Sequence, residues 1–264
     1  MPFTPSHAVV ALPFVRTPLV PAAIAIGAMT PDLPLFVRGV GLNYSFTHGF
    51  GNVVWTGLLA FGLFLLWRVV LRPAVPELSP AWLARRLPPE WEDRGTVAAR
   101  KAVGAVEKRS YPVLLALSLL LGVLSHILWD LFTHEGRWGV QLVPGLDEMW
   151  GPLAGFKWLQ HGSSVIGLAV IGVWALLWLR RRRLRPDVEQ WLPAGVRIAW
   201  WVSLPIILLG AWGWGLIALG PIDADFTVQH LAYRVLPPAC ALWGAVTLVL
   251  CVVVSVRGRR HQTG

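Results

Sequence analysis

Three metal-capable side chains recur every four residues near the end of a long apolar run: His126, Asp130 and His134. The α-helix repeats every 3.6 residues, so this spacing places all three on one helix face. Imidazole nitrogens and carboxylate oxygens are ligands for Zn²⁺, and also for Mn²⁺ or Fe²⁺. Ionisable groups are costly within a bilayer and tend to mark functional sites. The stretch therefore predicts a metal site on a membrane helix.

Each residue taken alone also fits a simpler role. A single histidine in a membrane helix is more commonly a hydrogen-bonded structural residue, and His134 at a helix end can interact with the helix dipole. Asp32 in Thr-Pro-Asp fits an ordinary turn, and the segment around His48 fits a loop. Only the combination of these residues favours metal binding.

The elements that must position these residues follow from composition. The chain has 264 residues, of which 55% are hydrophobic and 14% charged, whereas soluble domains average about 25% charged residues. We predict an all-α fold, a polytopic membrane bundle of about five transmembrane helices in one integral-membrane domain (1–264). Each expected span is near the roughly 20 residues needed to cross hydrocarbon; the spans are 51–67, 112–133, about 163–179, about 198–219 and about 236–256.

The net charge of +9 gathers beside the expected spans. Basic residues are frequent in the predicted cytoplasmic loop 73–110, after the third span and in the tail, whereas the alternate loops carry only Arg137, Lys157 and Arg234. The positive-inside rule then places the C-terminus in the cytoplasm and the protein in the inner membrane. This distribution does not predict nucleic-acid binding. Cys240 and Cys251 share one apolar run and form no disulfide or metal motif.

Residues 1–50 form a predicted interfacial segment that bears ligands. Thr4 and Pro5 resemble a helix start, which puts His7 in the first turn. The apolar stretch 18–29 is too short to cross alone; it fits a re-entrant or interfacial helix, or the core of a signal peptide whose cleavage would remove His7. On this topology every histidine except His261 lies on or toward the extracytoplasmic side of the membrane. The predicted metal ligands are His7, Asp32, His48, His126, Asp130, His134 and His161, while His230, Asp223 and Asp225 fit a loop surface.

Four motifs carry a resemblance to a known family: Met1-Pro-Phe-Thr-Pro-Ser-His7, Met29-Thr-Pro-Asp32, Thr47-His48-Gly49 and the stretch from Ser125-His126 to Thr133-His134. Together they resemble a bacterial integral-membrane family of unknown function, domain-of-unknown-function family 4184, over most of the chain. That resemblance implies no activity.

The order of ligands is more loosely similar to the zinc-dependent phospholipase C and S1/P1 nuclease superfamily, and to membrane-bound metal-dependent hydrolases of bacteria. The similarity implies that one metal is held by Asp32, His48, His126 and Asp130, a second by His7 and Asp130, and a third by His134 and His161. Val165 stands where those enzymes have a glutamate, so we expect two ions rather than three unless Glu135, Asp147 or Glu148 substitutes.

These observations lead to two expectations of function. The first is a membrane-embedded hydrolase of a phosphoester, lipid or lipid-linked, in which Zn²⁺ activates water and stabilises phosphate charge. The resemblance gives Asp32 a catalytic role, and Arg137 or Lys157 would bind the phosphate. The second is a non-catalytic membrane protein with a structural metal or a haem held by His126 and His161. The sequence leaves the oligomeric state open, and no pair of broken spans suggests a transporter.

Overall fold

The computed structural model describes residues 3–37, 41–105, 108–186, 188–223 and 225–262, apart from the side chains of 258–262. Helices dominate the described chain, and its strands are two short ones, β1 (Met149–Trp150) and β2 (Leu153–Ala154), paired antiparallel. Helices long and apolar enough to cross a membrane cover Phe50–Leu78, Tyr111–Thr133, Gly155–Arg180, Ala194–Ala218 and Val228–Arg257. The all-α prediction is thus confirmed, and the chain is a multi-pass membrane protein.

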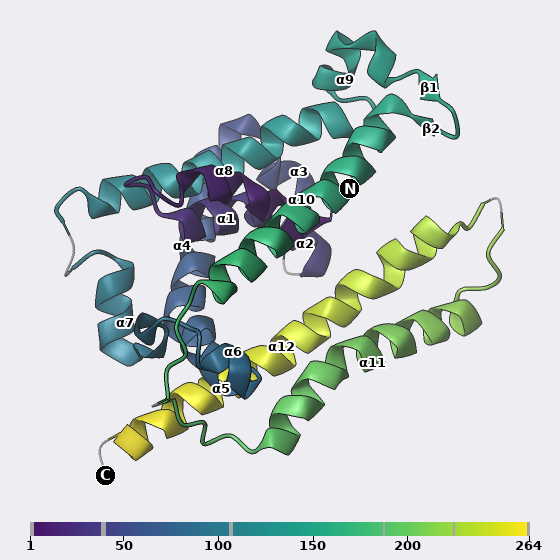
Figure 1. The fold of residues 1–264 in the computed structure, drawn as a ribbon. Coiled ribbons are helices and arrows are strands. Elements are labelled where there is room, and N and C mark those ends of the chain that lie inside the picture. Colours follow the sequence, from purple (N-terminus) through teal and green to yellow (C-terminus); the bar gives the residue numbers. More distant parts are fainter. Residues whose placement is uncertain (1–2, 38–40, 106–107, 187, 224, 263–264) are drawn as a thin grey trace. The chain divides into compact units, whose positions relative to one another are not determined.

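The chain divides into two compact units, and the first comprises Met1–Pro34, Leu42–Leu65 and Val103–Arg181. In it, α1 lies along α8, and the 3-10 helix η1 packs against α1, α8 and α10 (Figure 1). Its elements in chain order are η1 (Thr4–Phe14), α1 (Pro21–Met29), η2 (Thr30–Asp32), α3 (Tyr44–Thr47), η3 (Phe50–Asn52), α4 (Val53–Leu66), α8 (Tyr111–Thr133), α9 (Trp138–Leu142), η6 (Pro144–Leu146), β1, β2 and α10 (Gly155–Arg180). The short helix α2 (Leu33–Phe36) follows η2.

Two glycines let the backbones of α1 and α8 touch. A methyl group on Gly122 would lie 2.7 Å from the Ala28 nitrogen, and one on Gly27 would lie 3.2 Å from the Gly122 Cα. Both separations are tighter than ordinary van der Waals contact, so neither position has room for a side chain. The apolar segment 18–29 therefore becomes a short helix held against a membrane span. The contact also brings the carbonyl end of α1 beside the next turn of α8, where His126 stands.

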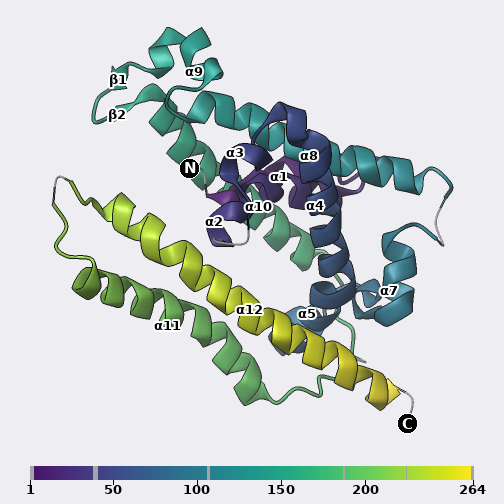
Figure 2. The same ribbon diagram turned by 180° about the vertical axis from the view of Figure 1, so that it is seen from behind.

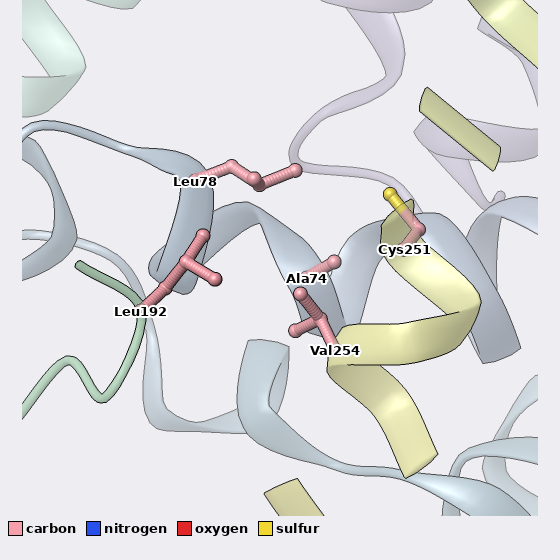
Figure 3. Packing of buried hydrophobic residues seen from close by; sticks show 5 residues of the cluster. All are labelled: Ala74, Leu78, Leu192, Cys251 and Val254. Atoms are coloured by element: carbon pink, nitrogen blue, oxygen red, sulfur yellow. The ribbon is translucent and has the colours of Figure 1, made fainter. Parts of the chain in front are cut away.

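The second unit comprises Leu35–Gly41, Leu66–Ala102 and Arg182–Gly264. Its long helices α11 (Ala194–Ala218) and α12 (Val228–Gln262) run side by side (Figures 1 and 2). Its shorter elements are the π-helical turn η4 (Trp67–Leu71), α5 (Arg72–Leu78), α6 (Ala81–Ala84), η5 (Pro89–Glu92) and α7 (Gly95–Ala102). A core of Ala74, Leu78, Leu192, Cys251 and Val254 joins α5 to the C-terminal part of α12 (Figure 3).

Helix ends differ from the expected span ends at several places. The fourth spanning helix begins at Ala194 and the fifth at Val228, four and eight residues before the expected starts. The first spanning helix continues to Leu78 although residues 73–78 were expected in a loop; the π-helical turn directly before Pro73 and Pro76 lets the helix absorb the hydrogen bonds that proline cannot donate. The third spanning helix begins at Gly155, eight residues before Ser163. As a result, residues 155–162 lie within a helix, and their side chains have a defined angular order around its axis.

Candidate metal centre

Four side chains from three separate segments converge at the C-terminal end of α8. Asp32 ends η2, His48 caps α3, and His126 and Asp130 lie one turn apart on α8. All four are buried, with exposed fractions of 1% for Asp32, 6% for His48, 0% for His126 and 3% for Asp130. The structure thus brings together the four residues that the resemblance implies for one metal ion.

Five of the six distances between their ligand atoms match those expected around a single small cation. His48 Nε2 lies 3.2 Å from His126 Nε2, 3.7 Å from Asp32 Oδ1 and 3.5 Å from Asp130 Oδ2. His126 Nε2 lies 3.6 Å from Asp32 Oδ1 and 3.5 Å from Asp130 Oδ2. Zinc bonds of about 2.1 Å to nitrogen and oxygen give tetrahedral ligand separations of about 3.4 Å. Every one of these five separations is within a few tenths of an ångström of that value.

Backbone carbonyls determine which imidazole nitrogens face the centre. His126 Nδ1 lies 2.7 Å from the Ala28 oxygen, and His48 Nδ1 lies 2.9 Å from the Tyr44 oxygen. A carbonyl oxygen only accepts hydrogen bonds, so each Nδ1 carries a proton. In the neutral form of each ring, the Nε2 atom then carries a lone pair and no proton. Two imidazole lone pairs and two carboxylate oxygens consequently point at one another with no hydrogen-bond donor among the four atoms.

The charge of the cluster, like its lack of donors, favours a bound cation. Two carboxylates and two neutral imidazoles carry a net charge of −2 in a buried position at a membrane helix, which is strongly unfavourable unless it is compensated. One divalent cation would neutralise the cluster and would convert every repulsive contact into a metal–ligand bond. In a competing state, one proton on an Nε2 makes that nitrogen a donor to the other Nε2 at 3.2 Å, and a net charge of −1 stays buried. The donor set therefore fits a divalent metal ion.

Side chains around the ligands hold them in position. The Thr4 hydroxyl donates to Asp32 Oδ2 at 2.7 Å, so η1 fixes the carboxylate whose other oxygen faces the centre. The Thr47 hydroxyl donates to the Pro31 oxygen at 2.7 Å and ties α3 to η2. The Tyr44 hydroxyl donates to Asp130 Oδ2 at 3.4 Å, and burial raises the pKa of this phenol, which keeps it a donor. Such outer partners orient metal ligands and adjust their basicity.

His7 lies beside this cluster and supplies a second one. Its ring stacks on His126 with centroids 4.1 Å apart, and its ligand nitrogen falls in one group with Asp32 and His126. Burial, aided by the nearby His126, lowers the pKa of His7 to about 3, so the ring is neutral. Within the described residues, His7 Nε2 and Asp130 Oδ1 are buried atoms that have no hydrogen-bond partner. His7 and Asp130 are the two residues that the resemblance implies for a second metal ion.

His134 and Gln160 border the cluster on the side of α10. His134 Nδ1 lies 3.6 Å from Asp130 Oδ2, and Nε2 lies 3.4 Å from Gln160 Nε2. Burial lowers the pKa of His134. Gln160 is fully buried, and in the part of the chain that the structure describes its Oε1 has no hydrogen-bond partner. Gln160 is not among the site residues predicted from the sequence. A helix that starts at Gly155 would have indicated it, because Gln160, Ser164 and Gly167 then share the face that contacts η1.

The other predicted site residues lie apart from the ligands. His161 follows Gln160 around α10 and is exposed, so the structure does not bring it to His134. Arg137 caps α9 near enough for its charge to act on the pKa values of Tyr44 and His134. Lys157 instead lies over the Phe156 ring, 5.4 Å from its centroid. Outside the cluster and exposed are Glu135, Asp147, Glu148 and His230, and the His261 side chain lies outside the described residues.

A cavity of about 670 Å³ adjoins the cluster at His7. It lies between η1, α8 and α10, and its walls are largely apolar; they include Val9, Val10, Trp129, Ile166 and Val170. His7 is thus the ligand candidate that both contacts the cluster and borders open space.

Fold and site define a multi-pass membrane protein with a buried histidine–aspartate centre at one end of a spanning helix. Residues 1–256 match the family described as Domain of unknown function (DUF4184), and the chain belongs to this family. No curated protein and no solved structure matches the chain. The comparisons therefore lend no support to the looser resemblance to phospholipase C and related hydrolases.

Proposed function

We propose that this protein is a membrane-embedded, metal-dependent hydrolase of a phosphoester, with Zn²⁺ as the preferred ion. The observation that carries the proposal is the meeting of four buried acceptor atoms, from Asp32, His48, His126 and Asp130, with no donor among them. Nitrogen and oxygen ligands at these separations suit zinc. The two unpartnered atoms beside them, on His7 and Asp130, favour a second ion.

A divalent ion held here would lower the pKa of water and stabilise charge on phosphate oxygens. The protein's own contribution is positioning. His48 and His126 are oriented by backbone carbonyls, and Asp32 by the Thr4 hydroxyl. The resemblance gives Asp32 the role of orienting an attacking water; its Oδ2 accepts from Thr4 and its Oδ1 faces the centre. We assign substrate phosphate binding to Arg137 rather than Lys157, because the Arg137 charge acts on Tyr44 and His134 whereas Lys157 lies over the Phe156 ring.

A structural metal site is the second candidate, and one observation favours it. The four ligands are almost fully buried, and closed four-ligand sites are typical of structural zinc. The cavity at His7 argues for the catalytic alternative, because a catalytic ion needs an open position. Haem is less well supported: His126 Nε2 points into the cluster, whereas His161 is exposed.

Loop charge gives the proposed orientation. The basic residues lie mainly in 68–109, 180–197 and the tail, and the positive-inside rule assigns these segments to the cytoplasm of a bacterial cell. The C-terminal end of α8, with the cluster, would then face the outer side of the inner membrane. Substrate would reach the site from that side.

The test combines hydrolysis with metal content. Detergent-purified protein, wild type and variant, is assayed with bis(p-nitrophenyl) phosphate, and bound zinc is measured by elemental analysis. We expect His126→Ala and Asp130→Asn to lose both activity and metal, by more than about 100-fold in activity because the ion supplies most of the catalysis. His161→Ala is the matched control, since that histidine is exposed, and it should retain both. Wild-type protein that holds zinc but turns over no phosphodiester would establish the structural alternative instead.

A further inference from the structure

We infer that the cavity beside His7 binds one hydrocarbon chain of a membrane lipid, whose phosphate then lies at the metal centre. The identification of that lipid as a substrate rests on the proposed function; the binding of its chain does not. We call this cavity the chain groove. It is bounded by η1, α8 and α10, all within the first unit, and has a volume of about 670 Å³.

The lining of the chain groove is polar beside the metal centre and apolar beyond it on α10 and η1. His7 stacks on His126 of the centre, and Ser6, Ser125 and Ser163 are further polar residues of the lining. Trp158 and Leu159 precede Ser163 along α10, whereas Ile166 and Val170 follow it and, with Val9 and Val10 of η1, offer no hydrogen-bonding side chain. A ligand with an anionic head and a long apolar tail matches this lining, because a bound metal ion would coordinate the head while the valines and isoleucine contact the tail.

The length of the chain groove corresponds to one leaflet. Trp158 and Val170 both line it, and the helical rise between them is about 18 Å. The hydrocarbon core of a bilayer is about 30 Å thick, so a chain confined to one leaflet extends over roughly 15 Å. The chain groove can thus hold an acyl or isoprenoid segment that enters from one side.

The surroundings select hydrocarbon over water as the occupant. Two walls are the candidate membrane spans α8 and α10, and Ile166 is 65% exposed in the described structure. Within a bilayer such a surface meets lipid, and an apolar space without polar partners does not retain water. Gly162 keeps the polar end wide, since a side chain added there would have no atom within 4 Å.

Photolabelling tests the occupant directly. Full-length protein in detergent is mixed with an equimolar phosphatidylglycerol that carries a diazirine in the middle of one acyl chain, is irradiated, and is mapped by mass spectrometry. We expect label on residues 9–10 and 162–170. Ile166→Trp, which narrows the chain groove, should reduce this label at least fivefold. Val165→Trp makes a similar change at a residue that is 69% exposed but outside the groove, and it should label like wild type.

Three outcomes overturn the inference. Label distributed equally over the exposed faces of α10, Val165 included, would mean ordinary lipid contact. Equal labelling of Ile166→Trp and wild type would mean that the chain lies elsewhere. The third outcome combines two measurements: wild-type protein shows no groove label and is dimeric by light scattering, whereas the Ile166→Trp variant is monomeric. That result would assign the surface to a second copy of the chain.

The design separates failure of this inference from failure of the proposed function. Asp130→Asn should label like wild type while losing hydrolysis, because the chain groove does not depend on Asp130. Groove labelling in a protein without phosphodiesterase activity would leave the inference standing and remove the catalytic proposal. In active protein, Ile166→Trp should raise KM for a long-chain phosphodiester about tenfold, whereas Val165→Trp, outside the groove, should leave that KM unchanged.

Discussion

At the scale of residues, the centre depends on the orientation of two imidazole rings. Each donates from Nδ1 to a carbonyl of another segment or turn, Ala28 for His126 and Tyr44 for His48, and so turns Nε2 inward. A histidine without such a partner can present either nitrogen. The backbone of the N-terminal segment is therefore part of the site even though it supplies no ligand atom.

The Thr4 hydroxyl should control how tightly metal is held. Thr4→Val keeps the shape of the side chain but removes the hydrogen bond to Asp32 Oδ2. Loss of an outer partner of this kind costs about 10- to 100-fold in metal affinity, and we expect a decrease in that range by competition with a chelator. Thr17→Val is the control, because Thr17 is exposed and its hydroxyl contacts only its own turn. Equal affinity in both variants would mean that Thr4 does not orient the ligand.

Gln160 illustrates what residue type alone cannot predict. His161 drew attention because imidazole is a common ligand, yet the buried side chain at this point of the helix is the amide one position earlier. A shift of one residue turns a side chain by about 100° around a helix. With the helix expected to start near Ser163, the directions of residues 160 and 161 around its axis were undefined. The contacts of α10 with η1 were needed to show which of these two residues is buried.

At the scale of elements, the contact between α1 and α8 sets the position of the centre. Gly27 and Gly122 allow the two backbones to meet, and His126 then reaches the Ala28 carbonyl one turn later. The hydropathy of α8 was evident in the sequence, as were the approximate positions of all five spans. The partner of α8 was not, because a nine-residue apolar helix fits several membrane placements equally well.

Gly122→Ala tests that contact. The added methyl would lie 2.7 Å from the Ala28 nitrogen, so α1 must move away. Overpacking of this kind costs about 1–3 kcal/mol, and displacement of the Ala28 carbonyl should also release His126. We expect a lower midpoint of thermal unfolding and reduced zinc content. Gly62→Ala, at an exposed helical glycine with no atom within 4 Å of the added carbon, should leave both unchanged. Normal zinc content in Gly122→Ala would show that the site tolerates separation of the two helices.

At the scale of the whole molecule, every residue of the metal centre belongs to the first unit. Both clusters of candidate ligands draw on Met1–Pro34, Leu42–Leu65 and Val103–Arg181, whereas α11 and α12 form their own pair in the second unit. A bound ion stabilises the folded state of the part that binds it. Its influence should therefore be uneven along the chain.

Chelation should loosen the first unit selectively. Metal at about 1,000 times its Kd contributes about 4 kcal/mol to folding stability, and its removal forfeits that amount. We expect faster amide hydrogen exchange in α1, α3 and the C-terminal turns of α8 after treatment with a chelator, and unchanged exchange in α11 and α12. Readdition of zinc should restore protection. A uniform increase across both units would indicate that the ion stabilises the protein in another way.

The bond between His126 and Ala28 joins residues 98 positions apart, and this separation has a consequence for biogenesis. The ribosome delivers residues 1–50 first, so α1 reaches the membrane before the helix α8 that packs against it. Only after α8 has been inserted can the imidazole of His126 meet its carbonyl partner and the pocket for an ion exist. On the proposed function, metal binding would therefore follow the insertion of α8 rather than accompany the synthesis of the N-terminal segment.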